Sequence, residues 1–160
     1  MRLPAFIIRR LVDLTATVAE RDADFIIGQP HDPYMLRWWL TPRKRCLPGV
    51  YLHAIMRSDD DRALHDHPWW NVSILLVGGY IEHTPNGPIK RRAGDVVFRR
   101  PAALHRLELN NGTAWSLFIR GPKVREWGFA CPKGWVHWKT FCGVDGAEAK
   151  GDEVGPGCGE

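Results

Sequence analysis

Two histidines separated by a single residue, His65 and His67, are the first candidates for chemistry in this sequence. Residues two apart on a β-strand point to the same face, so the two imidazoles could share a metal ion. A neutral hydrogen-bonded pair of histidines has the same spacing, so the pair alone leaves both interpretations open. Asp66 points the other way on a regular strand, and we expect it to contact Arg62 rather than to support a ligand imidazole.

A third histidine, His105, lies at a spacing that extends the pattern. An apolar stretch, 71–77, follows His67, and Gly94 precedes His105 by eleven residues. This order resembles the two motifs of the cupin superfamily, the RmlC-like proteins, in which an HxH pair is followed by a second motif that runs from glycine to histidine. The resemblance covers about 50–120.

Departures from the cupin motifs change the expected ligand set. The glycine that opens the first motif falls on Asp59, and the glutamate of that motif falls on Asn71 or Val72. Asn71 could supply a weak neutral oxygen as a fourth ligand, whereas Val72 could supply nothing. In the second motif the proline is displaced by one position, to Pro101, which indicates the same turn.

The resemblance implies one divalent metal ion held by His65, His67 and His105, with Fe(II) favoured and Zn, Ni, Cu or Mn also compatible. An ion with three neutral ligands keeps its full charge and open positions, which suits a thiolate, an enolate or a carboxylate. A 2-oxoglutarate oxygenase uses two histidines and one carboxylate, so the set argues against that class. The stretch Leu64-His65-Asp66-His67 is similar to the thiol dioxygenase branch, which includes cysteine dioxygenase.

The leading functional hypothesis is therefore a metal-dependent cupin enzyme, a non-haem iron dioxygenase or a relative of one, that acts on a small anionic metabolite. No residue is assigned as a catalytic nucleophile. A metal-dependent isomerase or hydrolase is the first alternative, because the ion could polarise a carbonyl or activate water. A cupin that binds a small ligand without catalysis is the second, since the fold alone does not select a function.

Five residues near the expected barrel mouth are candidates for binding substrate: Arg57, Arg120, Tyr51, His53 and Trp69. Either arginine could clamp a carboxylate, with an ordinary surface role as the alternative. Tyr51 and His53 share a strand face, where they line the pocket or form a buried core pair. Trp69 either lines the pocket or fills the core.

Other residues of reactive types have simpler interpretations. His83 and His137 are held in reserve for acid–base work. Cys131 and Cys142 are expected to be packed thiols, because no base lies near them in the sequence. The acidic run 59–61 does not have the spacing of a calcium loop, so we interpret it as a solvated turn.

The elements that must position these residues begin with a helix. Ile7, Leu11, Leu14 and Val18 are spaced by four, three and four, which predicts an amphipathic helix packed on the rest of the domain. Binding to a membrane surface or to a partner is the alternative for this helix.

Beyond the helix the apolar pattern changes to a period of two, which indicates strands. The expected strands are 34–40, 50–56, 71–77, 80–83, 96–99, 106–109 and 115–120. Glycine, proline and asparagine punctuate them, and Asn111-Gly112 is the strongest hairpin signal. The predicted fold class is all-β: a single-domain antiparallel cupin barrel, also called a double-stranded β-helix or jelly roll, with an N-terminal amphipathic helix.

Three segments are expected. The helix occupies 1–25, the barrel with an irregular C-terminal cover occupies 26–142, and 143–160 is expected to be a disordered acidic, glycine-rich tail. The length of 160 residues suits one domain.

The charge and the cysteines limit which partners and which compartment we expect for this protein. The chain has a net charge of +4, of which 1–142 carries +8 and the acidic tail −4. The basic residues are scattered and no nucleic-acid motif accompanies them, so we expect a small anionic ligand and no nucleic acid. No apolar run is long enough to span a membrane, and four cysteines without a tight framework predict reduced thiols and a cytoplasmic protein. A homodimer is common among cupins, but nothing in the chain specifies one.

Overall fold

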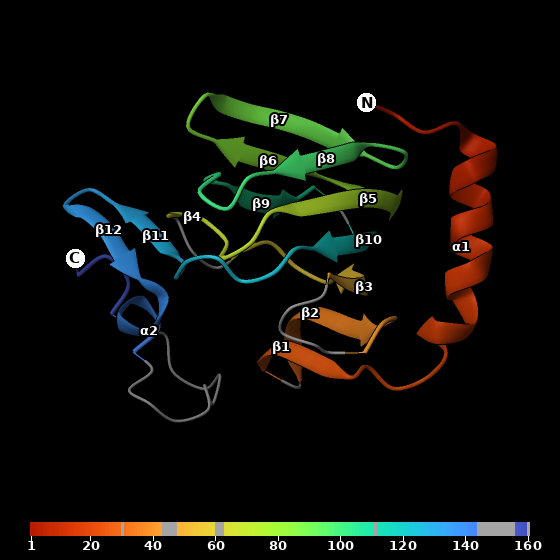
Figure 1. The fold of residues 1–160 in the computed structure, drawn as a ribbon, viewed down its shortest axis with the longest axis horizontal. Helices are drawn as coiled ribbons and strands as arrows, with labels where there is room; N and C mark the ends of the chain where they lie inside the picture. The colour runs from red at the N-terminus through yellow and green to blue at the C-terminus, as the bar shows by residue number, and fades with distance from the viewer. Residues whose placement is uncertain (30, 43–47, 60–62, 111, 144–155, 160) are drawn as a thin grey trace.

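A computed structural model describes residues 1–29, 31–42, 48–59, 63–110, 112–143 and 156–159. The helices and strands, in chain order, are α1 (Ala5–Ala19), β1 (Phe25–Gln29), β2 (Asp32–Trp39), β3 (Gly49–Ile55), β4 (Leu64–His65), β5 (Asn71–Val77), β6 (Gly79–Thr84), β7 (Gly87–Arg92), β8 (Val96–Arg99), β9 (Arg106–Leu109), β10 (Ala114–Arg120), β11 (Gly128–Cys131), β12 (Gly134–His137) and α2 (Trp138–Phe141). Figure 1 shows α1 on one side of the strands and the hairpin of β11 and β12 on the opposite side.

The strands form one large sheet and two small ones. Six strands pair in the order β1-β2-β3-β10-β5-β8, and the small sheets have the orders β7-β6-β9 and β12-β11-β4. Strand β5 belongs to the large sheet and the next strand, β6, to a small one, so the chain changes sheet at Gly78. Gly78 has a φ of 71°, and a Cβ there would lie 2.4 Å from the carbonyl oxygen of Thr113, so this corner requires glycine.

Alternation along the strands divides the apolar side chains between two cores. Leu75 belongs to the core between the large sheet and β6 and β9, whereas Leu76 belongs to the core beneath α1. The first core contains Met35, Ile55, Leu75, Tyr80, Leu107 and Ala114. The second contains Trp38, Leu52, Ala54 and Leu76, with side chains of α1 packed against them.

The predicted strands 71–77, 96–99 and 106–109 coincide with β5, β8 and β9, and the other predicted strands differ from the observed ones by one or two residues at their ends. The all-β antiparallel fold is therefore confirmed. The sequence analysis did not predict β1, β7, β11 or β12 as strands. Strand β7 carries a proline and three basic residues at an exposed edge, so it lacks the period of two.

The hairpin predicted at Asn111-Gly112 is wrong. Strand β9 before it pairs with β6, and β10 after it pairs with β3 and β5, so the two strands lie in different sheets. The chain passes from a small sheet to the large one between β9 and β10, so this glycine-containing connection is a corner and not a hairpin turn. Asn111 itself lies outside the described residues.

Helix α1 packs on the large sheet through a face rotated from the predicted one. Ile8 is buried and Leu11, Val12 and Val18 pack against the second core. Leu14, assigned to the buried face from its spacing, is 73% exposed. The contact face follows Ile8 and Val12, since a helix has 3.6 residues per turn, and it leaves Leu14 pointing outward.

The C-terminal cover is more regular than predicted. It consists of the β11–β12 hairpin and α2, and a disulfide joins Cys131 to Cys158. The expectation of reduced thiols is thus wrong for this pair, and Cys142 is not part of this disulfide. The predicted disordered tail falls mostly on 144–155, outside the described residues.

Within the described part of the chain, no helix is long and apolar enough to cross a membrane.

Candidate metal centre

Three histidines from distant parts of the chain meet at one point. His65 ends β4, His67 follows it, and His105 comes immediately before β9. His65 and His105 form an antiparallel bridge in which each backbone N–H donates to the carbonyl oxygen of the other at 2.9 Å. The N–H of His67 donates to the carbonyl oxygen of Pro101 at 3.0 Å. These backbone hydrogen bonds therefore fix the positions of the Cα atoms that carry the three imidazoles.

The three imidazoles converge. Taking one ring nitrogen from each of His65, His67 and His105, all lie within 4.8 Å of one another, and the Nε2 atoms of His67 and His105 are 2.8 Å apart. The ring centroids are 4.7 to 5.2 Å apart. Nitrogens bound to one ion at the usual distances of about 2.0–2.1 Å lie roughly 3–3.5 Å apart, so the cluster needs only small shifts to hold a metal. The structure thus brings together all three predicted ligands.

Burial lowers the pKa of all three imidazoles. The pKa of His105 falls to about 3, although the neighbouring Glu82 carboxylate opposes the effect. Burial lowers the pKa of His67 well below its usual range, and the other two histidines add to the shift. Burial also lowers the pKa of His65 against the opposing charge of Asp59. The rings are therefore neutral at pH 7, the state in which an imidazole binds a metal.

A buried carboxylate that the sequence analysis missed lies behind His105. Glu82, on β6, is 2% exposed, and it accepts hydrogen bonds from Nε of Arg99 at 2.6 Å and from Nε of Arg91 at 2.7 Å. Its Oε1 lies 3.3 Å from Nδ1 of His105, close but not aligned for a regular hydrogen bond. Burial alone would raise the pKa of Glu82, but His105 and Arg99 outweigh burial and hold it well below its usual range.

The ionised Glu82 selects a tautomer of His105. A carboxylate beside Nδ1 favours the proton on that nitrogen, which leaves a lone pair on Nε2, the atom facing His67. Glu82 thereby takes the place of the motif's missing glutamate, but it acts through an imidazole. Its signal in the sequence is Tyr80-x-Glu82, a charged residue at an inward position of a strand, where charges are rare.

Asn71, the candidate fourth ligand, is fully buried beside Arg99. Its Oδ1 accepts a hydrogen bond from Nη1 of Arg99 at 3.3 Å. The same guanidinium nitrogen donates to Oγ of Ser73 at 3.1 Å. The oxygen proposed for the metal is therefore engaged by the arginine that also contacts Glu82.

Asp59 is buried, so its interpretation as part of a solvated turn is wrong. Its side chain is 7% exposed, and Oδ2 accepts a hydrogen bond from the backbone N–H of Leu107 at 2.6 Å. The same oxygen lies 3.9 Å from Nδ1 of His65. The other two aspartates, 60–61, lie outside the described residues. Asp59 thus stands behind His65 much as Glu82 stands behind His105.

Asp66, between the two motif histidines, turns toward the C-terminal cover. It is 2% exposed, and it accepts hydrogen bonds from the N–H of Gly128 at 2.9 Å and from Nε1 of Trp135 at 3.1 Å. Arg125 forms an ion pair with it. The predicted direction, away from the metal face, agrees with these contacts, whereas the predicted partner Arg62 lies outside the described residues.

Four of the five predicted substrate-binding residues form a second cluster beside the histidines. Nε of Arg120 donates to the hydroxyl of Tyr51 at 2.8 Å, and the guanidinium lies 5.0 Å from the ring centroid of Trp69. Trp69 stacks on the imidazole of His67, with 6.5 Å between the centroids. The ring of His53 lies 6.0 Å from that of Tyr51, nearly parallel to it. Arg120 is thus held between two aromatic rings near the candidate centre.

His53 and Arg57 contact different partners. Nε2 of His53 accepts a hydrogen bond from Nε of Arg37 at 2.8 Å, and burial lowers the pKa of His53 well below its usual range. Arg57, the fifth candidate, pairs with Asp32 at 3.4 Å. The structure therefore brings Arg120 beside the candidate centre, and substrate binding by Arg57 stays a prediction.

The two reserve histidines each contact a glutamate. His83 lies 2.7 Å from Glu108 on a small sheet, and His137 lies 3.3 Å from Glu126. Of the two, His137 lines a cavity beside the candidate centre.

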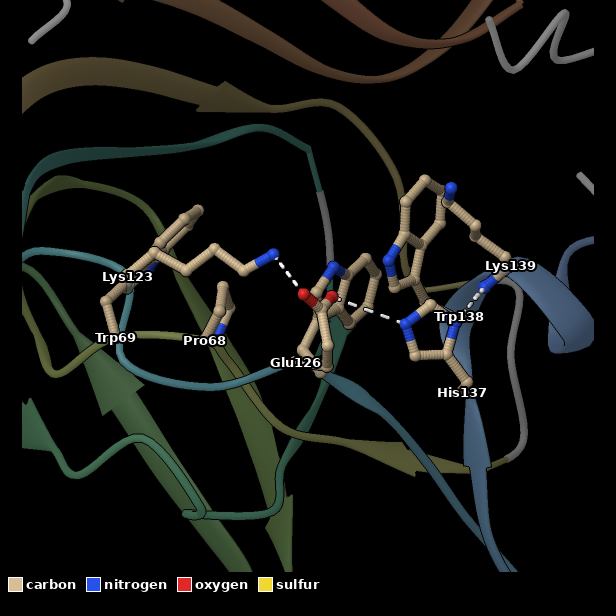
Figure 2. A pocket seen from close by; sticks show the side chains of 8 residues that line it. Pro68, Trp69, Lys123, Glu126, His137, Trp138 and Lys139 are labelled. Atoms are coloured by element: carbon tan, nitrogen blue, oxygen red, sulfur yellow. Dashed lines mark hydrogen bonds and ion pairs between the residues drawn. The ribbon is translucent and has the colours of Figure 1, made fainter. Parts of the chain in front are cut away.

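That cavity has a volume of about 340 Å³ and is rich in tryptophan. Its lining residues, which we call the tryptophan vestibule, are Pro68, Trp69, Lys123, Glu126, Trp127, His137, Trp138 and Lys139. Figure 2 shows Lys123 and Trp69 on one side, His137, Trp138 and Lys139 on the other, and Glu126 between them. From the sequence, the residues after Lys123 were assigned only to an irregular C-terminal cover and not to a site.

Comparison with known proteins identifies the fold. No family model and no curated protein matches the chain. The DMSP lyase DddQ from Ruegeria pomeroyi matches with a TM-score of 0.56, 13% identity and coverage of 84% of this chain and 83% of that one. A Klebsiella pneumoniae protein with a double-stranded β-helix domain matches with a TM-score of 0.50, 16% identity and coverage of 64% and 89%. A cupin superfamily protein from Desulfitobacterium hafniense has a TM-score of 0.49, 14% identity and coverage of 68% and 87%.

The chain therefore has the cupin fold, a double-stranded β-helix, as the histidine and glycine spacing predicted. At such low identity the matches identify the fold alone. Within this fold the chain has a candidate metal centre of three histidines, His65, His67 and His105, and a tryptophan-lined cavity beside it.

Proposed function

We propose that this protein is a metal-dependent enzyme that holds one divalent ion, Fe(II) in preference to others, and acts as a dioxygenase on a small anionic substrate. The observation that carries the proposal is the convergence of three neutral imidazoles with no carboxylate among them. A bound ion would keep its full charge and open positions for an anionic substrate and dioxygen.

The protein's own residues have separable tasks in this proposal. The three histidines hold the ion, and Glu82 orients the imidazole of His105. Arg120, beside Trp69 and Tyr51, provides a fixed positive charge for the acidic group of the substrate. The aromatic rings around His67 exclude water from the reacting groups.

The first test is elemental analysis of natively purified protein and of the variant His105→Ala. We expect about one equivalent of metal in the wild type and its loss in the variant, because two imidazoles bind a divalent ion much more weakly than three. The matched control is His83→Ala, which removes a histidine that contacts Glu108 and leaves the candidate centre intact. Full metal retention in His105→Ala would reject the site.

The second test separates the reaction classes. Protein loaded with Fe(II) under anaerobic conditions is mixed with oxygenated buffer and screened over thiols, enols and keto acids in an oxygen electrode. Substrate-dependent oxygen uptake supports the dioxygenase. Turnover without oxygen uptake points to an isomerase or hydrolase, and a ligand-dependent rise in melting temperature without turnover points to a binding protein.

A further inference from the structure

The tryptophan vestibule continues the candidate metal centre outward. Trp69 stacks on His67, and the edge of Trp127 approaches His65, with 6.4 Å between the centroids. Trp127 in turn stacks on Trp138 at 5.6 Å, with only 8° between the ring planes. Two walls of the cavity therefore carry indoles, and Trp69 and Trp127 among them pack beside the histidines of the candidate centre. A planar ring in this cavity would stack on the indoles next to the proposed ion.

Positive charge predominates in the vestibule. Its single carboxylate among the lining residues, Glu126, is already paired with Lys123 and His137. The ammonium of Lys139 lies 5.9 Å from the ring centroid of Trp138, and it contacts no carboxylate in the part of the chain that the structure describes. The unmatched charge attracts an anion and opposes a cationic ligand.

A second unmatched cation lies at the inner end. The guanidinium of Arg120 contacts Tyr51, the carbonyl oxygen of Gly121 and the ring of Trp69, and among the described residues it meets no carboxylate. Arg120 and Lys139 thus sit over indoles on opposite walls. A cation of the protein already lies over each of these two indoles, and its charge disfavours a cationic ligand there.

The cavity is small. Its volume of about 340 Å³ lies at the lower end of the range for small-molecule pockets, roughly 300–1,000 Å³. A single aromatic ring with a short acidic side chain suits this volume, whereas a nucleotide or a peptide would extend beyond it.

From these walls, charges and dimensions, we propose that the tryptophan vestibule binds a small aromatic carboxylate. The ring lies between the walls that carry Trp69 and Trp138, and the carboxylate contacts the ammonium group of Lys139. The claim that this acid is the substrate rests on the proposed function, because it names the class of acid brought to the metal centre. The claim that the vestibule binds such an acid requires no metal.

The test uses isothermal titration calorimetry of the full chain after its metal has been removed with a chelator. Three probes separate the ring from the charge: phenylacetate, cyclohexylacetate, which lacks the π system, and 2-phenylethanol, which lacks the charge. We expect phenylacetate to bind at one site per chain. Cyclohexylacetate should bind about fivefold more weakly, because it loses ring stacking, and 2-phenylethanol at least about tenfold more weakly, because it loses the charged contacts.

Two variants locate the binding in the vestibule. Lys139→Gln should weaken phenylacetate binding about tenfold, and Trp138→Leu should abolish the preference for phenylacetate over cyclohexylacetate. The control is Lys133→Gln, which removes the same charge from the turn between β11 and β12, outside the cavity lining. Its phenylacetate affinity should equal that of the wild type. Because Trp138 stacks on Trp127, the lysine variant keeps the test decisive if the tryptophan variant unfolds.

Equal affinity for the three probes, no binding of phenylacetate, or the same loss in Lys133→Gln as in Lys139→Gln would overturn the proposal. The variant His105→Ala distinguishes this failure from failure of the enzyme proposal, since it should lose metal yet bind phenylacetate normally. Metal binding without phenylacetate binding rejects the vestibule proposal alone. Phenylacetate binding by a wild type that never takes up metal rejects the enzyme proposal alone.

Discussion

At the scale of single residues, the candidate metal centre depends on carboxylates that no histidine motif contains. Glu82 lies behind His105 and Asp59 behind His65, at 3.3 and 3.9 Å from the respective Nδ1 atoms. Glu82 favours a proton on Nδ1 of His105, and the charge of Asp59 lies near the ring of His65. A proposed ion would therefore meet neutral imidazoles with a carboxylate behind two of them.

Glu82→Gln should weaken metal binding by about 10–100-fold, because the amide no longer holds the proton on Nδ1 of His105. The amide also leaves the buried Arg99 without its charged partner, so we expect a loss of about 2–3 kcal/mol in the free energy of unfolding. Competition with a chelator for Co(II), followed by its visible spectrum, measures affinity and coordination together. A merely structural role would lower stability and leave the spectrum and affinity of the folded fraction unchanged.

The matched control is Glu108→Gln. Glu108 contacts His83 at 2.7 Å on a small sheet, so the change removes a glutamate–histidine pair of the same kind away from the centre. Its metal affinity should equal that of the wild type. Wild-type affinity in Glu82→Gln as well would contradict the orienting role of Glu82.

The histidines were predictable and their supporting carboxylates were not, for a physical reason. His65 and His67 lie two residues apart, and His105 follows at the spacing of a known second motif, so the sequence retains their relation. Glu82 meets His105 only because β6 pairs with β9, and no spacing along the chain encodes that contact. The position of Asn71 in the motif likewise did not reveal its contact with Arg99.

At the scale of elements, the two-residue strand β4 links the candidate centre to the C-terminal cover. It pairs with β11 on one side and with His105 through an isolated bridge on the other. Asp66, the next residue in the chain, accepts a hydrogen bond from the backbone N–H of Gly128 at the same junction. The cover thus helps to hold the loop that carries two of the three proposed ligands.

Asp66→Asn should destabilise this junction by about 2–3 kcal/mol. The asparagine side chain keeps one acceptor oxygen, but its amide group would face the N–H of Trp135 or the guanidinium of Arg125, so donors would oppose donors. Hydrogen exchange at β11 and β12 should accelerate together with the loss of stability in urea unfolding. Metal affinity should also fall, because the changed residue lies between His65 and His67.

The control for that variant is Asp32→Asn. Asp32 has a side chain that is 69% exposed and pairs with Arg57 at the surface. Surface ion pairs contribute about 0–1 kcal/mol, so the control should unfold close to the wild type. Unchanged exchange rates in β11 and β12 of Asp66→Asn would show that the cover does not depend on this carboxylate.

Strands with a clear period of two were predicted almost to the residue, whereas strands outside the barrel centre were not. In β5, buried and partly exposed positions alternate because one face meets β6 and β9 and the other meets α1. Strands β11 and β12 gain their order from packing around Asp66 and from the disulfide rather than from alternation. The turn at Gly112 could not reveal whether the next strand paired locally or in the other sheet.

At the scale of the whole molecule, the C-terminal cover contributes two features, part of the cavity lining and a disulfide. The tryptophan vestibule combines residues that follow β4 with residues of the C-terminal cover, so its walls come from separate parts of the chain. The Cys131–Cys158 disulfide anchors the end of the chain to β11. The cytoplasmic prediction rested on reduced thiols, and this disulfide removes that premise without identifying a compartment.

The disulfide should stabilise the protein mainly through this cover. It closes a loop with a sequence separation of 27 residues, which corresponds to about 3–4 kcal/mol of loop-closure entropy. The double variant Cys131→Ser, Cys158→Ser should therefore unfold in less urea than the wild type, and reductant should lower the wild type to the same midpoint. The variant Cys142→Ser, which changes the cysteine after α2 that is not part of this disulfide, should keep its sensitivity to reductant. Because the vestibule is lined partly by the cover, phenylacetate affinity should fall with the loss of the disulfide, whereas metal binding at the three histidines should persist.

A urea midpoint that does not respond to reductant, or peptide mapping that finds Cys131 and Cys158 unlinked, would contradict this account of how the cover is held.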